Sequence, residues 1–383
     1  MSNFLNCVRA DNEFLYLSKN EFYVDKTELI GKFNEIIDGY KQRYRCITRP
    51  RRFGKSINAM MLASYYSKNL DTTETFNRFD ISKDETYLKH LNKHNVIFIS
   101  FTKGEDIFKT YDKFIGFFRG GLIEDLKEIV PELDENKPIS SIFEEVYDKA
   151  GQKFIFIIDE WDYIFNNNLY SEDEKKDFLR FLTDLFKDRA YVELVYMTGI
   201  LPIAKHSSKS TINMFKEYSA IDDEVYSRYF GFTQKEVERL CKKQNKISLQ
   251  ELQEWYNGYC TQSGEKIYNP RSVVCALEDG TCKSYWVNTG KMDDIVECIQ
   301  GNVDKIRDDI IRMLEEKSIS IELSEFSSEK LELNTREQIL SAMVILGFLS
   351  YHDGYINIPN RELKMKFADS LKNNIFGDFA KIV

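Results

Sequence analysis

A Gly-Lys-Ser triplet at residues 54–56 offers the clearest chemistry in the sequence. A short apolar stretch, residues 44–48, comes before it, and a stretch with helical character, residues 57–66, follows it. In a strand–loop–helix unit this triplet is typical of a loop that holds phosphate groups. The free N–H groups and the dipole at the start of the helix attract an anion. We expect Lys55 to reach the β- and γ-phosphates of a nucleotide and the Ser56 hydroxyl to bind Mg²⁺.

The first half of the usual loop pattern, G-x-x-x-x-G-K-[ST], is absent. Its first glycine falls on Arg49, and the following Pro50, Arg51 and Arg52 make the loop stiffer and more basic than a glycine-rich loop. Two other interpretations stay open at this point. The segment can be an ordinary turn with solvated basic side chains, or a local basic patch for nucleic acid.

A second motif lies at residues 154–160, where apolar β-forming residues run directly into Asp159 and Glu160. This is the pattern of a Walker B strand. At the carboxyl end of such a strand, Asp159 can face the Mg²⁺ shell beside the loop that follows residues 44–48. Glu160 can orient and activate the attacking water. A buried strand that ends in surface acids is a common alternative, but the Gly-Lys-Ser triplet and this motif support each other.

Further candidate residues lie near these two motifs. Thr198 ends the apolar stretch 192–198, where a sensor of the γ-phosphate is expected, and a threonine that caps a turn fits equally well. Arg51 or Arg52 is a candidate for stabilising the charge that develops on phosphate, and an arginine of another subunit or Arg228 is the alternative. We predict catalytic roles for Glu160, Lys55 and Arg52 and metal ligation by Ser56 and Asp159. The predicted nucleotide-binding set is Arg51, Arg52, Phe53, Gly54, Lys55, Ser56, Ile57, Asp159 and Thr198.

The composition excludes several classes of protein. With 383 residues, 43% of them apolar and 14% aromatic, the chain is long enough for two or three domains and is not disordered. A net charge of −9 argues against broad attraction to nucleic acid or to an anionic membrane. The seven cysteines form no C-x-x-C pair, the amino terminus has no signal pattern, and there is no apolar run of 18 residues. We therefore expect a soluble cytoplasmic protein with reduced thiols.

The order of the elements predicts an α/β fold. Apolar strands expected at 44–48, 95–101, 154–159, 192–198 and 225–230 alternate with helices, which indicates parallel βαβ units in one sheet with helices on both faces. Beyond residue 231 helical patterns dominate. A helix at 335–347, followed by strands at 348–352 and 355–358 around an Asp-Gly turn, has the layout of a winged helix. Because this region has few basic residues, we favour an interaction or lid module over DNA binding.

We accordingly predict four parts of the chain. An N-terminal extended segment and helix occupies residues 1–40, and the P-loop ATPase core occupies 41–231. A helical lid occupies 232–295 and a winged-helix-like domain 296–383.

Taken together, these motifs resemble the predicted AAA-ATPase-like family of bacteria and their relatives. The family writes its loop as R-P-R-R-F-G-K, so the resemblance accounts for the missing glycine. It covers about residues 20–370 and rests on these segments, in order: Phe22–Thr27, Arg49–Ser56, Ile157–Asp162, Thr198–Ile200, Phe230–Thr233, Trp255–Tyr259, Tyr268–Pro270, Tyr285–Gly290, Gly347–Leu349 and Ile358–Asn360.

The resemblance implies a P-loop fold of the type with an additional strand between the Walker A and Walker B strands. It also implies an ATP–Mg²⁺ site at Gly54, Lys55, Ser56, Asp159 and Glu160. Many relatives continue into a nuclease-like domain after the Ile-Pro-Asn segment, and we expect no room for one before Val383.

We therefore predict an ATP-binding protein, an Mg²⁺-dependent ATPase that acts as a nucleotide-gated switch in the cytosol. ATP and ADP are its expected ligands, with a protein partner or a second copy of the chain as further partners and no membrane. The alternative is a nucleic-acid-associated or defence-system module that uses the winged-helix region, with ATP as regulator.

Overall fold

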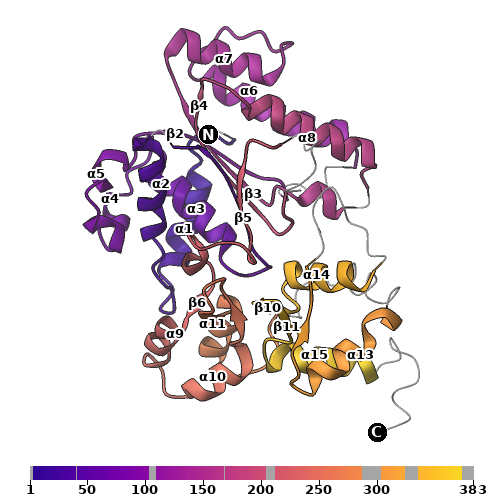
Figure 1. Cartoon of the computed structure of the whole chain (residues 1–383). Coiled ribbons are helices and arrows are strands. Elements are labelled where there is room, and N and C mark those ends of the chain that lie inside the picture. The colour runs from indigo at the N-terminus through magenta and orange to yellow at the C-terminus, as the bar shows by residue number, and fades with distance from the viewer. Residues whose placement is uncertain are drawn as a thin grey trace. The chain divides into compact units, whose positions relative to one another are not determined.

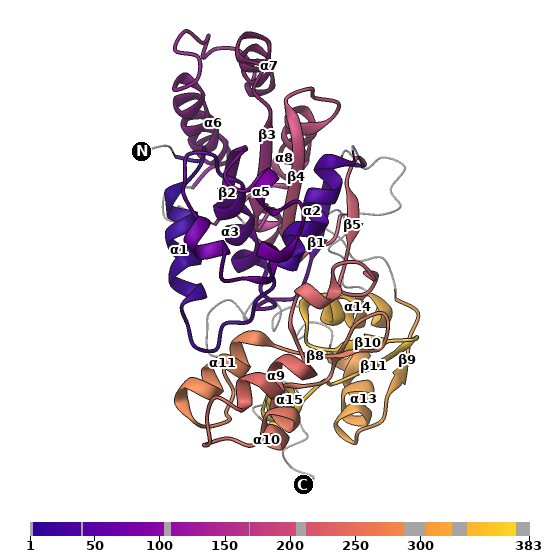
Figure 2. The same ribbon diagram turned by 90° about the vertical axis from the view of Figure 1, so that its left-hand side faces the viewer.

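The structure is a computed structural model that describes residues 3–39, 41–102, 109–167, 169–203, 212–286, 303–323 and 335–372. The chain divides into two compact units (Figures 1 and 2). The first unit comprises Met1–Ile47, Lys55–Gly199 and Lys205–Glu217, and the second comprises Thr48–Gly54, Ile200–Ala204 and Tyr218–Val383. The division therefore falls inside the predicted phosphate loop, between Gly54 and Lys55.

The first unit is built around a five-stranded sheet with the strand order β2-β3-β4-β1-β5. β2 pairs in parallel with β3, and β3 with β4. Because β4 lies between β1 and β3, an additional strand separates the strand before the loop from the acidic strand, as the resemblance implied. Side chains of β1, β2 and β3 are buried throughout, which explains their continuous apolar sequence. The strands are β1 Tyr44–Thr48, β2 Asn95–Ser100, β3 Phe154–Asp159, β4 Val192–Gly199 and β5 Lys216–Tyr218.

Helices cover both faces of this sheet. α3 packs against β2, β3 and β4, with α1 beside it, on the face that Figure 2 turns toward the viewer. On the other face Phe156 of β3 contacts Phe143 of α7 and Phe186 of α8, with ring centroids 5.3 Å and 5.1 Å apart. The helices of this unit are α1 Val8–Ser18, α2 Glu28–Asp38, α3 Lys55–Tyr66, α4 Thr73–Phe76, α5 Tyr87–His90, α6 Tyr111–Lys127, α7 Ile139–Ala150 and α8 Glu172–Phe186.

The fifth strand of the sheet is β5 and not residues 225–230, so that prediction was wrong. Residues 225–230 contain a turn and a 3₁₀ helix, Ser227–Tyr229. The Asp223 carboxylate accepts hydrogen bonds from the backbone N–H groups of Val225 (2.8 Å) and Tyr226 (2.7 Å), which bends the chain there. Apolar residues follow because Tyr226 and Phe230 are buried, and not because the segment is extended.

The second unit contains two three-stranded antiparallel sheets, β6-β8-β7 and β10-β11-β9. The predicted helix and hairpin near the carboxyl end are present, and Ser350 faces Asn357 in the hairpin register. The strands are β6 Phe232–Thr233, β7 Tyr259–Cys260, β8 Lys266–Tyr268, β9 Ile319–Ser320, β10 Ser350–His352 and β11 Tyr355–Asn357. The helices are α9 Gln234–Cys241, α10 Leu249–Tyr256, α11 Pro270–Asp279, α13 Val303–Leu314, α14 Arg336–Leu346 and α15 Arg361–Lys372.

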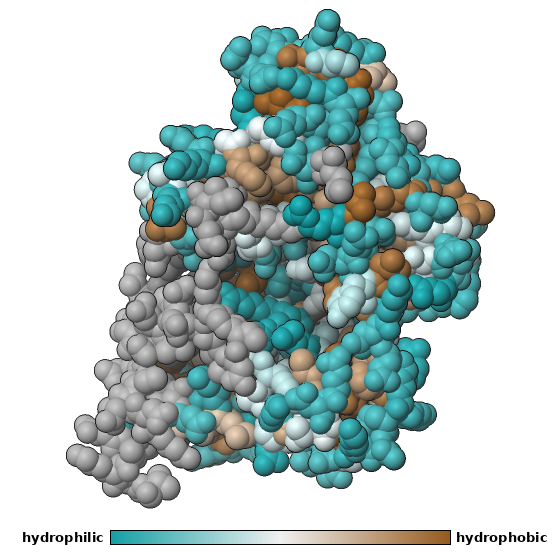
Figure 3. Space-filling view, turned by 180° about the vertical axis from the view of Figure 1, so that it is seen from behind, coloured by the Kyte–Doolittle hydropathy of each residue, from teal (hydrophilic) through white to brown (hydrophobic). Residues whose placement is uncertain are grey.

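The exposed surface is mostly polar. Figure 3 shows polar side chains over much of one face, with apolar residues in separate groups among them. In the described ranges no helix is both long enough and apolar enough to cross a membrane.

Four titratable side chains form a row in the first unit, near the amino-terminal ends of β2 and β4. His90 Nε2 lies 3.2 Å from a carboxylate oxygen of Asp38, and His90 Nδ1 lies 2.9 Å from His94 Nε2. His94 Nδ1 in turn lies 2.8 Å from a carboxylate oxygen of Glu193. Each of these three contacts needs one proton, so all are satisfied when one of the two imidazoles is charged and the other is neutral. Lys89, Lys153 and the Tyr66 ring also face this row.

We expect this row to make the fold sensitive to acid. Burial lowers the pKa of His90 below its ordinary value. The unfolded chain therefore takes up a proton at His90 before the folded chain does, and stability is lost as the pH falls through the unfolded pKa, about 6.5. Burial raises the pKa of Glu193, but the His94 hydrogen bond and charge outweigh it, so this group adds a further loss at lower pH.

Thermal unfolding at a series of pH values between about 7.5 and 5.5 tests this expectation. The free energy of unfolding should fall toward acid by at most about 1.4 kcal/mol per pH unit for each proton taken up. His90→Gln should flatten this slope, whereas His352→Gln, which changes an exposed histidine, should not. Equal slopes in wild type and His90→Gln would contradict the assignment.

Candidate functional site

The loop between β1 and α3 places Lys55 and Ser56 at the start of a helix. Gly54 has a φ of +88°, and Arg52 has a φ of +70°. Left-handed backbone of this kind is free of strain only for glycine, which explains why a glycine stands directly before Lys55. Lys55 and Ser56 are then the first two residues of α3, where backbone N–H groups have no partner within the helix.

The two sequence motifs meet in the first unit. Asp159, the last residue of β3, is only 4% exposed, and its carboxylate accepts a hydrogen bond from the Ser56 side chain. The pKa of Asp159 is raised to about 7, chiefly by burial and also by the charge of Glu160, while Ser56 and the charge of Lys55 oppose this shift. Lys55 is itself 6% exposed. The structure thus brings together Lys55, Ser56 and Asp159, as the motifs predicted.

One oxygen of the Asp159 carboxylate fits a metal ion. Oδ1 is buried and has no hydrogen-bond partner among the described residues. A buried carboxylate oxygen is costly unless a donor or a cation compensates it. Carboxylate and hydroxyl oxygens are ligands of the kind that Mg²⁺ prefers. The pair Ser56 and Asp159 therefore has the donor set of a magnesium site.

Glu160 has an unusual backbone conformation. Its φ is +53°, in the left-handed region, although it is not a glycine. Such residues cost about 1–3 kcal/mol and concentrate at functional sites. Hydrogen bonds on both sides hold the turn: the Glu160 carbonyl accepts from the Tyr163 N–H (3.0 Å), and the Trp161 N–H donates to the Thr198 carbonyl (3.2 Å). The Glu160 side chain is partly exposed, as a residue that acts on water requires.

Thr198 lies at the end of β4 and is completely buried. Its hydroxyl donates a hydrogen bond to the Ile47 carbonyl (2.8 Å), so it ties β4 to β1 just before the loop. The hydroxyl proton is thereby engaged with the backbone.

The remaining predicted residues divide between the two units. Ile57, the third residue of α3, is half-buried in the first unit, and Arg51 is half-buried in the second. The Arg52 guanidinium donates hydrogen bonds to the carbonyls of Tyr285 (2.9 Å) and Trp286. The Phe53 ring packs edge-on against Tyr259, with centroids 4.9 Å apart. Arg52 and Phe53 therefore make their described contacts with protein groups of the second unit.

The strand order of the first unit, with Lys55 and Ser56 at the start of α3 and Asp159 at the end of β3, defines a P-loop NTPase fold. Residues 12–208, more than half of the chain, match the model of the family described as "Predicted AAA-ATPase". The chain belongs to this AAA-ATPase-like family.

Individual relatives are distant. An uncharacterized protein encoded in the vnfD 5′ region of Azotobacter chroococcum is 26% identical over 304 residues, which are 73% of this chain and 52% of that protein. The chain thus spans about half the length of this curated relative. A Walker-type ATPase of Pyrococcus abyssi aligns over 88% of this chain and 95% of its own, with 12% identity and a TM-score of 0.43. PCH-2 of C. elegans aligns over 90% and 75%, with 10% identity and a TM-score of 0.28.

Proposed function

We propose that the protein binds ATP with Mg²⁺, hydrolyses it and uses the bound nucleotide as a switch. The observation that carries this proposal is the contact between the start of α3 and the end of β3, where Ser56 hydrogen-bonds to a buried Asp159 beside Lys55. Membership of an ATPase-like family supports it.

In this proposal each residue has a separate task. Ser56 and Asp159 hold Mg²⁺, which when bound neutralises charge on the phosphate oxygens. Lys55 and the N–H groups at the start of α3 bind the β- and γ-phosphates. Glu160 orients the attacking water and accepts its proton. Thr198 positions the end of β4 against the strand that leads into the loop.

The arginine that stabilises the developing charge is the least defined part of the proposal. Arg52 donates to two backbone carbonyls of the second unit, which favours a structural task for it. Arg51 is then the candidate within this loop, with an arginine of a second subunit as the alternative.

For the second unit we propose a helical lid at 232–295 and a winged-helix-like domain at 296–383. The strand order β9-β11-β10 supports the second assignment, because in a winged helix the first strand pairs with the last strand of the hairpin. We propose that this unit responds to the nucleotide rather than binding it alone, and that the responding partner is another protein.

Thermal unfolding with and without nucleotide tests the proposed function. Mg-ADP at about 100 times its dissociation constant should stabilise the protein by about 2.7 kcal/mol, because it binds the folded chain alone. Removing Mg²⁺ with EDTA should abolish most of the shift, because Ser56 and Asp159 then have no cation to share with the phosphates. An unchanged melting temperature with Mg-ATP and Mg-ADP would contradict nucleotide binding.

A further inference from the structure

Arg49, which stands where the usual loop has its first glycine, is buried in the second unit. Its guanidinium forms an ion pair with the Asp223 carboxylate, and the two side chains are only 3% and 1% exposed. The same guanidinium donates to the carbonyls of Thr48 (2.7 Å) and Tyr218 (3.0 Å) and lies 4.9 Å from the centre of the Phe230 ring. The arginine is therefore held on several sides by groups that water does not reach.

Asp223 connects this arginine to a second segment of the chain. One carboxylate oxygen pairs with Arg49, and the other accepts the N–H groups of Val225 and Tyr226. The Tyr226 ring packs edge-on against Tyr218, whose carbonyl binds Arg49, with centroids 4.7 Å apart. Asp223, Tyr218 and the turn at 225–226 thus form one closed set of contacts around the loop arginine.

Two further loop residues are fixed in the same unit. The Phe53 carbonyl accepts the Gly231 N–H (3.1 Å), and Phe53 belongs to the apolar core of this unit. A Cβ added at Gly347 would lie 2.6 Å from Pro50 Cβ, so the loop backbone packs closely on the end of α14. Loop residues 49, 50 and 53 are each held in place by the second unit.

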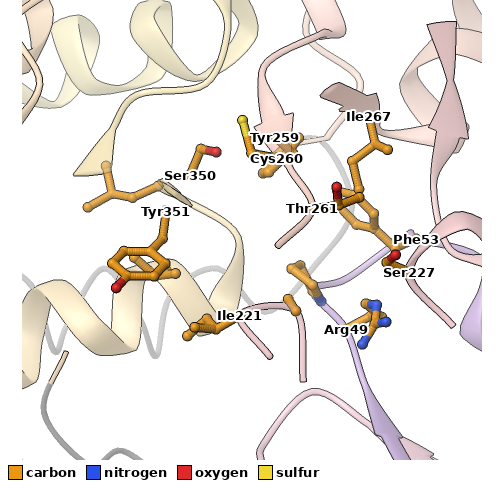
Figure 4. A pocket seen from close by; sticks show the side chains of 14 residues that line it. Arg49, Phe53, Ile221, Ser227, Tyr259, Cys260, Thr261, Ile267, Ser350 and Tyr351 are labelled. Carbon is orange, nitrogen blue, oxygen red and sulfur yellow. The ribbon is translucent and has the colours of Figure 1, made fainter. Parts of the chain in front are cut away.

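A cavity behind the loop is too small to hold a metabolite. Figure 4 shows Arg49 and Phe53 on one side of it and Ser350 and Tyr351 of β10 on the other. Its volume is ≈ 40 Å³, whereas pockets for drug-sized ligands measure roughly 300–1,000 Å³. The rear of the loop is therefore supported by protein groups, and Asp223 supplies the charge that balances Arg49.

We propose that Asp223 is a positioning residue for nucleotide binding. By fixing Arg49 it holds residues 49–54 in one conformation, and this conformation sets the direction in which the chain enters α3 at Lys55 and Ser56. Without the carboxylate the buried guanidinium loses its counter-charge and must find new partners, which releases the loop. The inference rests on the proposed nucleotide binding and adds how the site is kept in shape from the second unit.

Isothermal titration calorimetry with Mg-ADP on the full chain tests this role. Asp223→Asn should weaken binding at least tenfold at a temperature where the variant is folded, although Asp223 touches no phosphate. Asp309→Asn is the matched control, because it breaks the ion pair between Asp309 and Arg336 in the same unit. It should lower the melting temperature and leave the dissociation constant unchanged. In turnover assays Asp223→Asn should raise KM while kcat stays within about twofold, because Lys55 and Glu160 are intact.

The outcomes separate this inference from the proposed function. If the wild type does not bind Mg-ADP, the proposed function is wrong. If the wild type binds and Asp223→Asn has the same dissociation constant, or if Asp309→Asn weakens binding equally, the positioning role is wrong and the proposed function stands. Should Asp223→Asn not fold, Arg49→Lys serves instead. It keeps the charge but loses the planar set of donors, and an unchanged affinity would overturn the inference.

Discussion

The Lys55→Ala variant is expected to fold and to bind Mg-ATP and Mg-ADP about 100-fold more weakly than the wild type. Lys55 is buried beside Asp159, where an ammonium group interacts with little screening. Hydrogen bonds that involve charged groups contribute about 1.5–3 kcal/mol each, and Lys55 is expected to make at least one to the phosphates. Removing this cation also leaves Asp159 and the nucleotide phosphates without the positive charge that separates them.

Calorimetric titration of both nucleotides measures this effect. Lys176→Ala is a suitable control, because Lys176 is a solvent-exposed lysine of α8 in the same unit. It should bind nucleotide like the wild type. If Lys55→Ala and Lys176→Ala have the same dissociation constants, Lys55 does not contact the phosphates and the loop is not a nucleotide site.

The second large effect is expected for Glu160→Gln, which should bind Mg-ATP within about threefold of the wild type but hydrolyse it about 10²–10⁴-fold more slowly. Glutamine keeps the size and the hydrogen-bonding oxygen of the side chain and cannot accept the proton of the attacking water. The left-handed backbone of Glu160 already places this residue in a strained turn, so a substitution of the same shape is needed to leave the turn intact.

Phosphate release from Mg-ATP at saturating nucleotide measures the turnover of this variant. Glu172→Gln changes an exposed glutamate of α8 and should leave turnover unchanged. Equal turnover of Glu160→Gln and the wild type would remove Glu160 from the role of base, while nucleotide binding by Lys55 and Ser56 would stand.

The parts of the fold that could be predicted from sequence are those with strong local patterns. β1, β2, β3 and β4 are covered on both sides and show as continuous apolar runs. The contact between Ser56 and Asp159 was predictable because strands of a parallel sheet present their carboxyl ends at one edge. Both motifs lie at such ends.

Long-range contacts of the loop could not be predicted in the same way. Arg49 and Asp223 are 174 positions apart, and Asp223 stands in a short acidic stretch with no local pattern that singles it out. Glu362 was missed for the same reason. Its carboxylate is buried and accepts the N–H groups of Tyr285 (2.5 Å) and Trp286 (2.6 Å), whose carbonyls bind Arg52. The basic residues of the loop suggested contact with phosphate, whereas Arg49 and Arg52 are instead bound to protein groups.

Residues 225–230 show how burial alone can imitate a strand. Aromatic and branched residues favour strands because they suit a half-buried surface, and the same residues suit a buried turn. The deciding group is Asp223, whose hydrogen bonds to the next two residues are a local signal for a turn. That signal was present in the sequence and was outweighed by the apolar content.

A crystal structure of the full chain with Mg-ADP tests the central claim most directly. Our account predicts the diphosphate at the N–H groups that begin α3, with Lys55 on its oxygens. It also predicts Mg²⁺ about 2.0–2.1 Å from the Ser56 hydroxyl oxygen, with the Asp159 carboxylate bound to the metal directly or through one water. Nucleotide bound at another place, or a metal at this place with no link to Asp159, would contradict the account.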